Sequence, residues 1–152
     1  IHGKQNHYYD TFIYLNRAGL FYDTGRYKDA LKSLVKLYLS DSYRKADKVF
    51  RFKVEMSELI VTCEAADFEA LLYRISQVKK DYKALAANKA YQRDFALLEL
   101  LELIGQTGGL KGNDEVQKKI KQLLKMKVDE AAEESEIINY GGWLAKKMIQ
   151  KR

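Results

Sequence analysis

Residues 14–39, YLNRAGLFYDTGRYKDALKSLVKLYL, contain the pattern that decides the fold. Apolar residues recur there at helical spacing on both sides of a short polar break at residues 23–25. Because Gly25 can adopt a positive φ, the break predicts a tight turn. The stretch therefore predicts two helices, at about 8–23 and 26–39, that fold back on each other as a hairpin.

The hairpin sequence resembles a tetratricopeptide repeat. The repeat's aromatic, small and turn positions are occupied by Tyr14, Ala18, Phe21, Gly25, Tyr27 and Ala30. The match covers about residues 8–41, and a weaker second one covers about 42–86, where Phe68 and Leu71 stand in for Tyr27 and Ala30. The resemblance implies stacked antiparallel helix hairpins in a right-handed superhelix, with a concave face that binds a segment of a partner protein.

The composition favours an all-α fold. The chain has no Pro, which fits long helices joined by short turns. Its 152 residues are about the length of one domain. We expect about seven helices. The third is predicted at about 42–65, with Ser40-Asp41 as its cap and apolar stripes on two sides, and Asp67 is predicted to cap the fourth. The fifth is predicted at about 88–104 with Gly105 as its stop, the sixth from Asn113 or Asp114, and the seventh from about Glu130 with a kink at Gly141-Gly142. The predicted domain spans 1–152, with a disordered lead-in at 1–7, hairpins over 8–86, and additional helices and a cap over 87–152.

The single cysteine, Cys63, lies on an apolar helical stripe, so it predicts a buried thiol. One cysteine excludes a disulfide within the chain, which favours a reducing compartment and a cytoplasmic location. No apolar run approaches the ~20 residues of a membrane span. The chain begins Ile-His-Gly without Met, so we expect a fragment of a longer protein.

No residue set predicts catalysis, a metal or a cofactor. The two histidines, His2 and His7, both fall in the expected lead-in, away from any cysteine or carboxylate cluster. The Gly-rich segment 105–112 lacks the Gly-Lys-Ser/Thr ending of a phosphate loop and joins helix to helix. We therefore expect that the protein is not an enzyme.

Basic residues form two strips. The first, at 44–53, contains Arg44, Lys45, Lys48, Arg51 and Lys53, and the second, at 118–127, contains Lys118, Lys119, Lys121, Lys125 and Lys127. Helical geometry predicts that Arg44, Lys48 and Arg51 share one face. Each strip is either a solvated face or a site for an anionic partner.

The sequence therefore predicts a protein–protein interaction module that binds a protein or peptide segment, which could be acidic. The candidate binding residues are polar positions on the expected inner helices: Asn16, Arg17, Arg44, Lys48 and Arg51. The alternative function is binding of nucleic acid or another polyanion through the basic strips. Trp143 is expected to cap the array over the fifth and sixth helices, which predicts a monomer. The alternative is that Trp143 is exposed and serves dimerisation.

Overall fold

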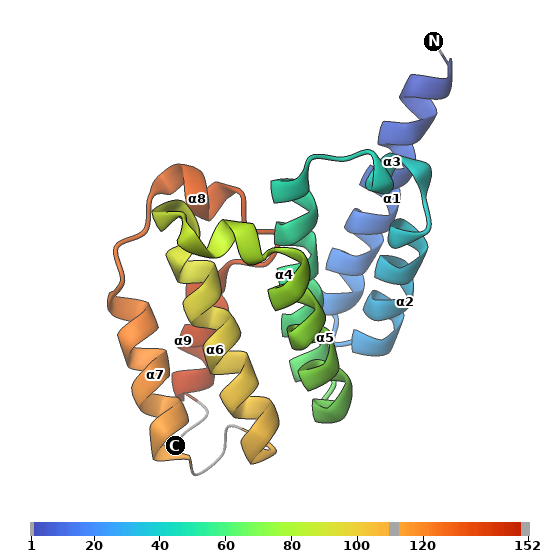
Figure 1. The fold of residues 1–152 in the computed structure, drawn as a ribbon. Coiled ribbons are helices and arrows are strands. Elements are labelled where there is room, and N and C mark those ends of the chain that lie inside the picture. Colours follow the sequence, from blue (N-terminus) through green and yellow to red (C-terminus); the bar gives the residue numbers. More distant parts are fainter. Residues whose placement is uncertain (1, 110–112, 150–152) are drawn as a thin grey trace. The chain divides into compact units, whose positions relative to one another are not determined.

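The structure is a computed structural model that describes residues 2–109 and 113–149. These residues form nine α-helices and two short 3-10 helices, without a β-strand among them, so the predicted all-α class is confirmed (Figure 1). The chain groups into two compact units, Ile1–Arg51 and Phe52–Arg152.

In chain order the helices are α1 (His2–Asp23), α2 (Tyr27–Tyr38), α3 (Asp41–Arg44), α4 (Lys48–Glu64), α5 (Phe68–Asp81), η1 (Lys83–Ala87), η2 (Lys89–Tyr91), α6 (Gln92–Thr107), α7 (Asp114–Lys125), α8 (Glu130–Glu134) and α9 (Tyr140–Ile149).

The first unit is built on the predicted hairpin. α2 packs along α1, and α3 contacts both helices. Gly25 reverses the chain with a φ of +78°, in the left-handed region that favours glycine. The Arg26 N–H donates to the Phe21 carbonyl at 2.7 Å and the Gly25 N–H donates to the Tyr22 carbonyl at 3.1 Å, which is a Schellman motif. The turn predicted from the sequence is thus confirmed.

The start of α1 differs from the prediction. Residues 2–7, predicted as a disordered lead-in, belong to the helix, and residue 1 lies outside the described residues. The segment lacks a periodic apolar pattern, but it contains no Pro, and helix formers such as Lys4 and Gln5 allow an existing helix to extend.

Ala30 is completely buried in the hairpin, and Ala18 on α1 is buried as well. Replacing Ala30 with Leu is expected to lower the free energy of unfolding by about 1–3 kcal/mol, because the added methylene groups overpack the interior. Chemical denaturation followed by circular dichroism measures this change. Replacing the exposed Lys32 on the same helix with Leu is the matched control, with an expected effect within about 0.5 kcal/mol. Equal midpoints for the two variants would show that Ala30 has room around it.

The long helix predicted at 42–65 is interrupted in the structure. The Ser40 hydroxyl caps the short helix α3, as the sequence predicted. Asp47 then starts α4, because its Oδ2 accepts hydrogen bonds from the N–H groups of Val49 at 3.1 Å and Phe50 at 3.4 Å. The prediction of one continuous helix is therefore wrong, since a second capping residue restarts the helix.

α4 provides the interior of the second unit. The residues from Phe52 to Cys63 are all buried, which agrees with the two apolar stripes that the sequence shows on this helix. Asp67 caps α5 as predicted, with its Oδ1 accepting from the Ala70 N–H at 3.2 Å.

α6 continues past its predicted stop at Gly105 and ends at Thr107. A Cβ at Gly105 would lie 2.8 Å from Leu72 Cδ2, so the glycine allows α5 and α6 to approach closely. Gly108, with a φ of +76°, ends the helix instead. Residues 110–112 of the predicted turn lie outside the described residues.

Asn113 caps α7 as predicted, but the helix expected from Glu130 is split into α8 and α9. Asn139 restarts the chain as α9, because its Oδ1 accepts from the Gly142 N–H at 2.7 Å. Gly141 and Gly142 thus lie in the first turn of α9 rather than at a kink. α9 packs against α7, and α7 against α6 (Figure 1).

Candidate functional site

One face of α1 carries large apolar side chains in contact with solvent. Tyr9, Phe12 and Leu20 expose 63%, 66% and 64% of their surface. Together with the exposed Asn16 they follow one another at intervals of three, four and four residues, which places them on one side of the helix. Ala18 is buried and lies on the opposite side. We call Tyr9, Phe12, Asn16 and Leu20 the outer stripe of α1.

The apolar pattern of α1 does not by itself separate the outer stripe from the buried face. Phe12 is exposed whereas Ala18 is buried, so the two residues lie on different faces of the helix. At about 100° per residue, the six positions from Phe12 to Ala18 leave the two side chains about 120° apart. α1 therefore has one apolar face directed to α2 and another directed to solvent.

Small and charged residues border the outer stripe. Asp10 and Arg17 are both exposed and lie on the same flank, two turns apart. Gly19 leaves space on the other side, because a Cβ built on it would meet no atom within 4 Å. The face thus combines an apolar centre, one carboxamide and charges of both signs.

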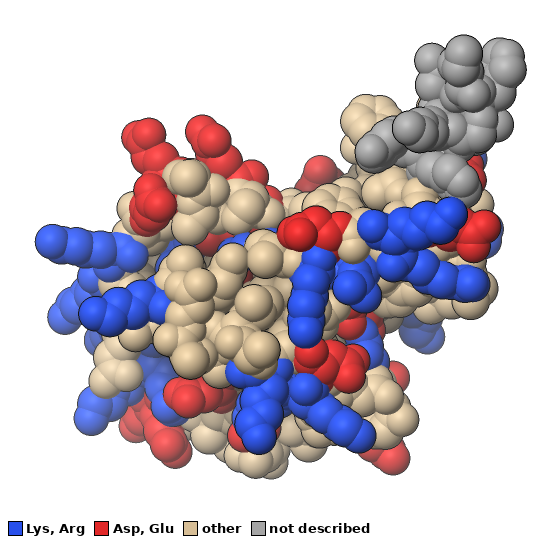
Figure 2. All heavy atoms as spheres, turned by 45° about the horizontal axis from the view of Figure 1, so that its top comes forward, with Lys and Arg blue, Asp and Glu red and all other residues tan. Residues whose placement is uncertain are grey.

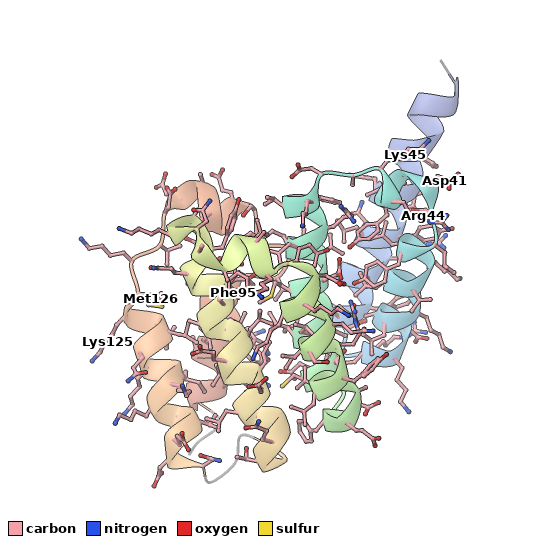
Figure 3. All side chains as sticks on the ribbon, viewed as in Figure 1. Asp41, Arg44, Lys45, Phe95, Lys125 and Met126 are labelled. Carbon is pink, nitrogen blue, oxygen red and sulfur yellow. The ribbon has the colours of Figure 1, made fainter. Side chains whose placement is uncertain are left out.

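The structure brings together only two of the five candidate binding residues. Asn16 and Arg17 are exposed neighbours at the outer stripe. Arg44 ends α3 (Figure 3). Lys48 and Arg51 instead lie in the first turn of α4. The prediction that Arg44, Lys48 and Arg51 share one helical face is therefore wrong, because the chain breaks between the two helices.

At least three of the five residues in the first basic strip make contacts within the protein. Arg44 Nη2 donates to the Leu39 carbonyl at 3.0 Å, and Arg51 Nε donates to the Ala46 carbonyl at 3.2 Å. Lys53 is buried in the second unit. Residues 44–53 thus do not present the continuous basic face that the sequence predicted.

The second basic strip is exposed. On and after α7 the solvent-facing members are Lys118, Lys121, Lys125 and Lys127. Glu130, Glu133 and Glu134 of the neighbouring α8 are exposed too. Figure 2 shows basic and acidic side chains interspersed on the face that it displays. Exposed acidic groups therefore follow the strip directly in the chain and oppose its attraction for an anion.

A buried ion pair connects three helices of the second unit. Lys53 Nζ on α4 lies 2.8 Å and 3.0 Å from the carboxylate oxygens of Asp94 on α6. The hydroxyl of Tyr140, the first residue of α9, donates to Asp94 Oδ1 at 2.7 Å. Lys53, Asp94 and Tyr140 are all at least 96% buried. We call these three residues the Lys53 cluster.

Arg93 and Glu136 extend this cluster. Arg93 Nη1 lies 2.5 Å from Glu136 Oε2, and Glu136 Oε1 accepts from the Tyr140 N–H at 2.8 Å. Burial raises the pKa of Glu136, while the Tyr140 N–H and the Arg93 guanidinium oppose that rise. Burial, with Asp94 beside it, also raises the pKa of Tyr140 well above its usual value. These contacts connect Arg93 of α6, through Glu136, to Tyr140 of α9.

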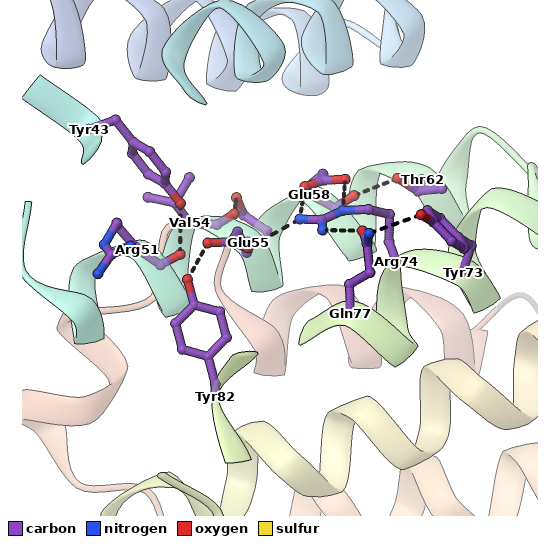
Figure 4. A network of polar contacts seen from close by, with 11 residues as sticks. Tyr43, Arg51, Val54, Glu55, Glu58, Thr62, Tyr73, Arg74, Gln77 and Tyr82 are labelled. Atoms are coloured by element: carbon purple, nitrogen blue, oxygen red, sulfur yellow. Dashed lines mark hydrogen bonds and ion pairs between the residues drawn. The ribbon is translucent and has the colours of Figure 1, made fainter. Parts of the chain in front are cut away.

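A second polar network joins α4 to α5 (Figure 4). The Arg74 guanidinium holds the Glu58 carboxylate with two bonds of 2.8 Å and 2.9 Å, and it reaches Glu55 at 3.2 Å. Glu55 also accepts from the Tyr82 hydroxyl. This bidentate geometry fixes the register of the two helices.

Glu64 of α4 binds two side chains of α9. The Trp143 indole N–H donates to Glu64 Oε1 at 2.7 Å, and Lys147 forms an ion pair with the same oxygen. Trp143 is buried, and α9 contacts α7, the predicted sixth helix. Cys63 is buried as predicted, and its pKa is raised to about 12 by burial and by the adjacent Glu64 carboxylate. A thiol with that pKa is almost fully protonated at neutral pH.

Sequence reasoning missed the Lys53 cluster, although one signal pointed to it. Asp94 precedes Leu97, Leu98 and Leu101 by three, four and seven positions, so it lies on the core stripe of its helix. A carboxylate at such a position requires a buried partner. The sequence does not reveal that the partner is Lys53, 41 residues earlier.

In the part of the chain that the structure describes, no group of three or more His, Cys, Asp or Glu side chains is arranged to hold a metal ion. Within the same residues, no helix has the length and apolar character needed to cross a membrane. Comparisons with protein-family models, with curated proteins and with solved structures found no match for this chain.

Proposed function

We propose that this chain is a non-enzymatic protein–protein interaction module, and that the outer stripe of α1 binds a helical segment of a protein partner. The observation that carries the proposal is the exposure of Tyr9, Phe12 and Leu20 on one helical face. Exposed apolar residues that are scattered singly need no explanation, but a contiguous set on one face is typical of an interaction surface. Aromatic residues are also enriched at such surfaces.

The polar residues at the stripe support a specific contact rather than non-specific adhesion. Asn16 offers both hydrogen-bond donors and an acceptor in the middle of the apolar face, and Arg17 adds a charge at its edge. A helix in the partner would meet the stripe with its own apolar residues spaced at i, i+3 or i+4 and i+7, as in other helical contacts.

The buried ionisable groups support a structural rather than a catalytic role for the second unit. Lys53, Asp94 and Tyr140 hydrogen-bond to one another, and Arg74 is held by Glu55 and Glu58. Groups bonded in this way fix helix positions.

We also propose that this chain contains stacked helix hairpins like those of tetratricopeptide-repeat proteins and that it acts in the cytoplasm. The α1–α2 hairpin, with its buried Ala18 and Ala30 and the turn at Gly25, supports this arrangement. The contacts of α5 with α6 and of α6 with α7 show successive helices packing side by side in the second unit. The concave binding face implied by such an array remains a prediction.

Polyanion binding through residues 118–127 is the second candidate function, because four lysines of that strip are exposed. Binding of this kind would weaken steeply with salt. Because exposed glutamates of α8 follow the strip, we rank this function below protein binding.

Site-specific photo-crosslinking tests the main proposal. Benzoylphenylalanine would replace Phe12 in the intact chain, and in a control protein it would replace Tyr73, an aromatic residue of equal exposure at 64% on α5. Irradiation of cells that make each protein is expected to give discrete protein adducts from position 12 and few from position 73. Absence of adducts from position 12, or the same adducts from both positions, would contradict the proposal.

A further inference from the structure

We propose that the partner of the outer stripe is a second copy of this chain, and that α1 pairs with α1 of that copy in an antiparallel, two-fold symmetric dimer. The inference rests on the proposed function, since it names the partner of the same surface. It replaces the expectation of a monomer.

The stripe fits an antiparallel copy of itself. Tyr9 and Leu20 lie at its two ends, eleven residues and therefore about 16 Å apart along the helix. A two-fold axis that crosses α1 near residues 14 and 15 sets Tyr9 of each chain beside Leu20 of the other. Phe12 and Asn16 of both chains then fill the centre of a continuous apolar contact.

The charges on the flank determine the orientation. A two-fold axis perpendicular to the helices brings the same flank of both copies together, so Arg17 of one copy comes within reach of Asp10 of the other, on both sides of the axis. A parallel two-fold arrangement would instead set Asp10 and Arg17 of the two copies on opposite flanks of the seam, so neither Asp10–Arg17 cross-pair would form. Because both residues are exposed on one flank, the antiparallel pairing is favoured.

Asn16 and Gly19 make the contact specific. A polar residue within an apolar helical seam selects one register, because its donors and acceptor must find partners when the seam closes. The carboxamide of Asn16 can meet that need in the centre of the seam. Gly19 has open space where a Cβ would stand, so the second helix can approach closely on that side.

A second copy fits this surface better than two other occupants. A lipid surface attracts helices with a strongly basic polar face, whereas Asp10 and Asp23 are exposed here. An acidic peptide would be repelled by the same two carboxylates. The stripe is complementary to a second copy of itself. Its apolar side chains and its carboxamide meet their counterparts, and the flank carries one charge of each sign.

The size of the stripe sets the strength of the dimer. Three side chains about two-thirds exposed present roughly 100–150 Å² each, so two copies bury on the order of 600–900 Å² of apolar surface. Stable specific interfaces begin at about 1,200 Å², so the dimer is expected to be weak, with a Kd of roughly 10–100 µM.

Sedimentation equilibrium of the intact chain at about 1 µM to 1 mM tests the inference. The protein is expected to pass from monomer to dimer in this range. Leu20→Ser is expected to raise the dimer Kd by about tenfold or more, whereas Leu39→Ser, at a leucine of nearly equal exposure, is the matched control and should leave it unchanged. Far-UV circular dichroism checks that both variants keep their helices.

Charge reversal tests the antiparallel orientation separately. Asp10→Arg is expected to weaken the dimer, and the double variant Asp10→Arg with Arg17→Asp is expected to restore it, because the cross-pairs are rebuilt with exchanged signs. A monomer at every concentration would overturn the inference. So would equal weakening by Leu20→Ser and Leu39→Ser, or a double variant no tighter than Asp10→Arg alone.

The two proposals fail separately. A monomeric chain whose position 12 still crosslinks to a different protein would refute the second copy and retain the interaction module. A monomeric chain without adducts at position 12 would refute both.

Discussion

Replacing Asp94 with Ala is expected to lower the free energy of unfolding by about 3–5 kcal/mol. The substitution leaves the Lys53 ammonium buried without its counter-ion and the Tyr140 hydroxyl without its acceptor. An unpaired buried charge costs more than the loss of an exposed ion pair, because solvent screens the exposed pair. Urea denaturation monitored by circular dichroism measures the change.

Two further variants separate the ion pair from packing at the same site. Asp29→Ala removes the exposed partner of Arg26 and is expected to cost less than about 1 kcal/mol, because solvent screens that pair. The double variant Lys53→Met with Asp94→Leu is expected to recover much of the loss, since two apolar side chains need no counter-ion. If Asp94→Ala cost no more than Asp29→Ala, the Lys53 cluster would not be stabilising the unit.

Deleting residues 129–152 is expected to make the protein aggregate. The deletion removes α9, which packs on α7 and whose Trp143 and Lys147 both bind Glu64 of α4. Apolar surface that α9 covers becomes exposed, and Glu64 loses both of its partners. Light scattering and size-exclusion chromatography detect the aggregation.

A point substitution tests the same contact without shortening the chain. Trp143→Ala is expected to cost about 3–5 kcal/mol, as for other large buried aromatic residues. The intact protein is expected to show blue-shifted Trp emission, because its only Trp is Trp143 and that side chain is buried. A soluble truncation with an unchanged denaturation midpoint, or solvent-like emission from the intact chain, would contradict this account of α9.

Much of the fold could be predicted because it depends on local chemistry. The turn at Gly25 and the caps at Ser40, Asp67 and Asn113 each combine a residue of known conformational or capping preference with an adjacent apolar period. Such signals involve neighbours in the sequence, so the sequence shows them directly.

The errors in the fold came from competing signals of the same kinds. Asp47 and Asn139 each restart a helix inside a continuous apolar pattern. The pattern alone did not show whether the first helix would continue or a capping residue would start a new one. Gly105 was predicted to end its helix, whereas it lies within α6. Its lack of a side chain leaves room for Leu72 of α5. That reason depends on a tertiary contact and not on local sequence.

The candidate site was predicted less well than the fold. Asn16 and Arg17 were identified on α1, but the sequence could not show which of two apolar faces α2 covers. The prediction of one basic face at 44–53 was wrong for a related reason. Lys53 is buried in an ion pair with Asp94, a residue distant in the sequence. Exposure depends on which side chains meet, and periodicity does not specify that.

Hydroxyl-radical footprinting tests most directly whether the outer stripe of α1 is an interaction surface. Tyr9, Phe12 and Tyr73 have nearly equal exposure, so in dilute purified protein they are expected to be oxidised to similar extents. In the cells that make the protein, Tyr9 and Phe12 are expected to be protected while Tyr73 is oxidised as before. Equal oxidation of all three residues in cells would contradict the assignment of this face as the binding surface.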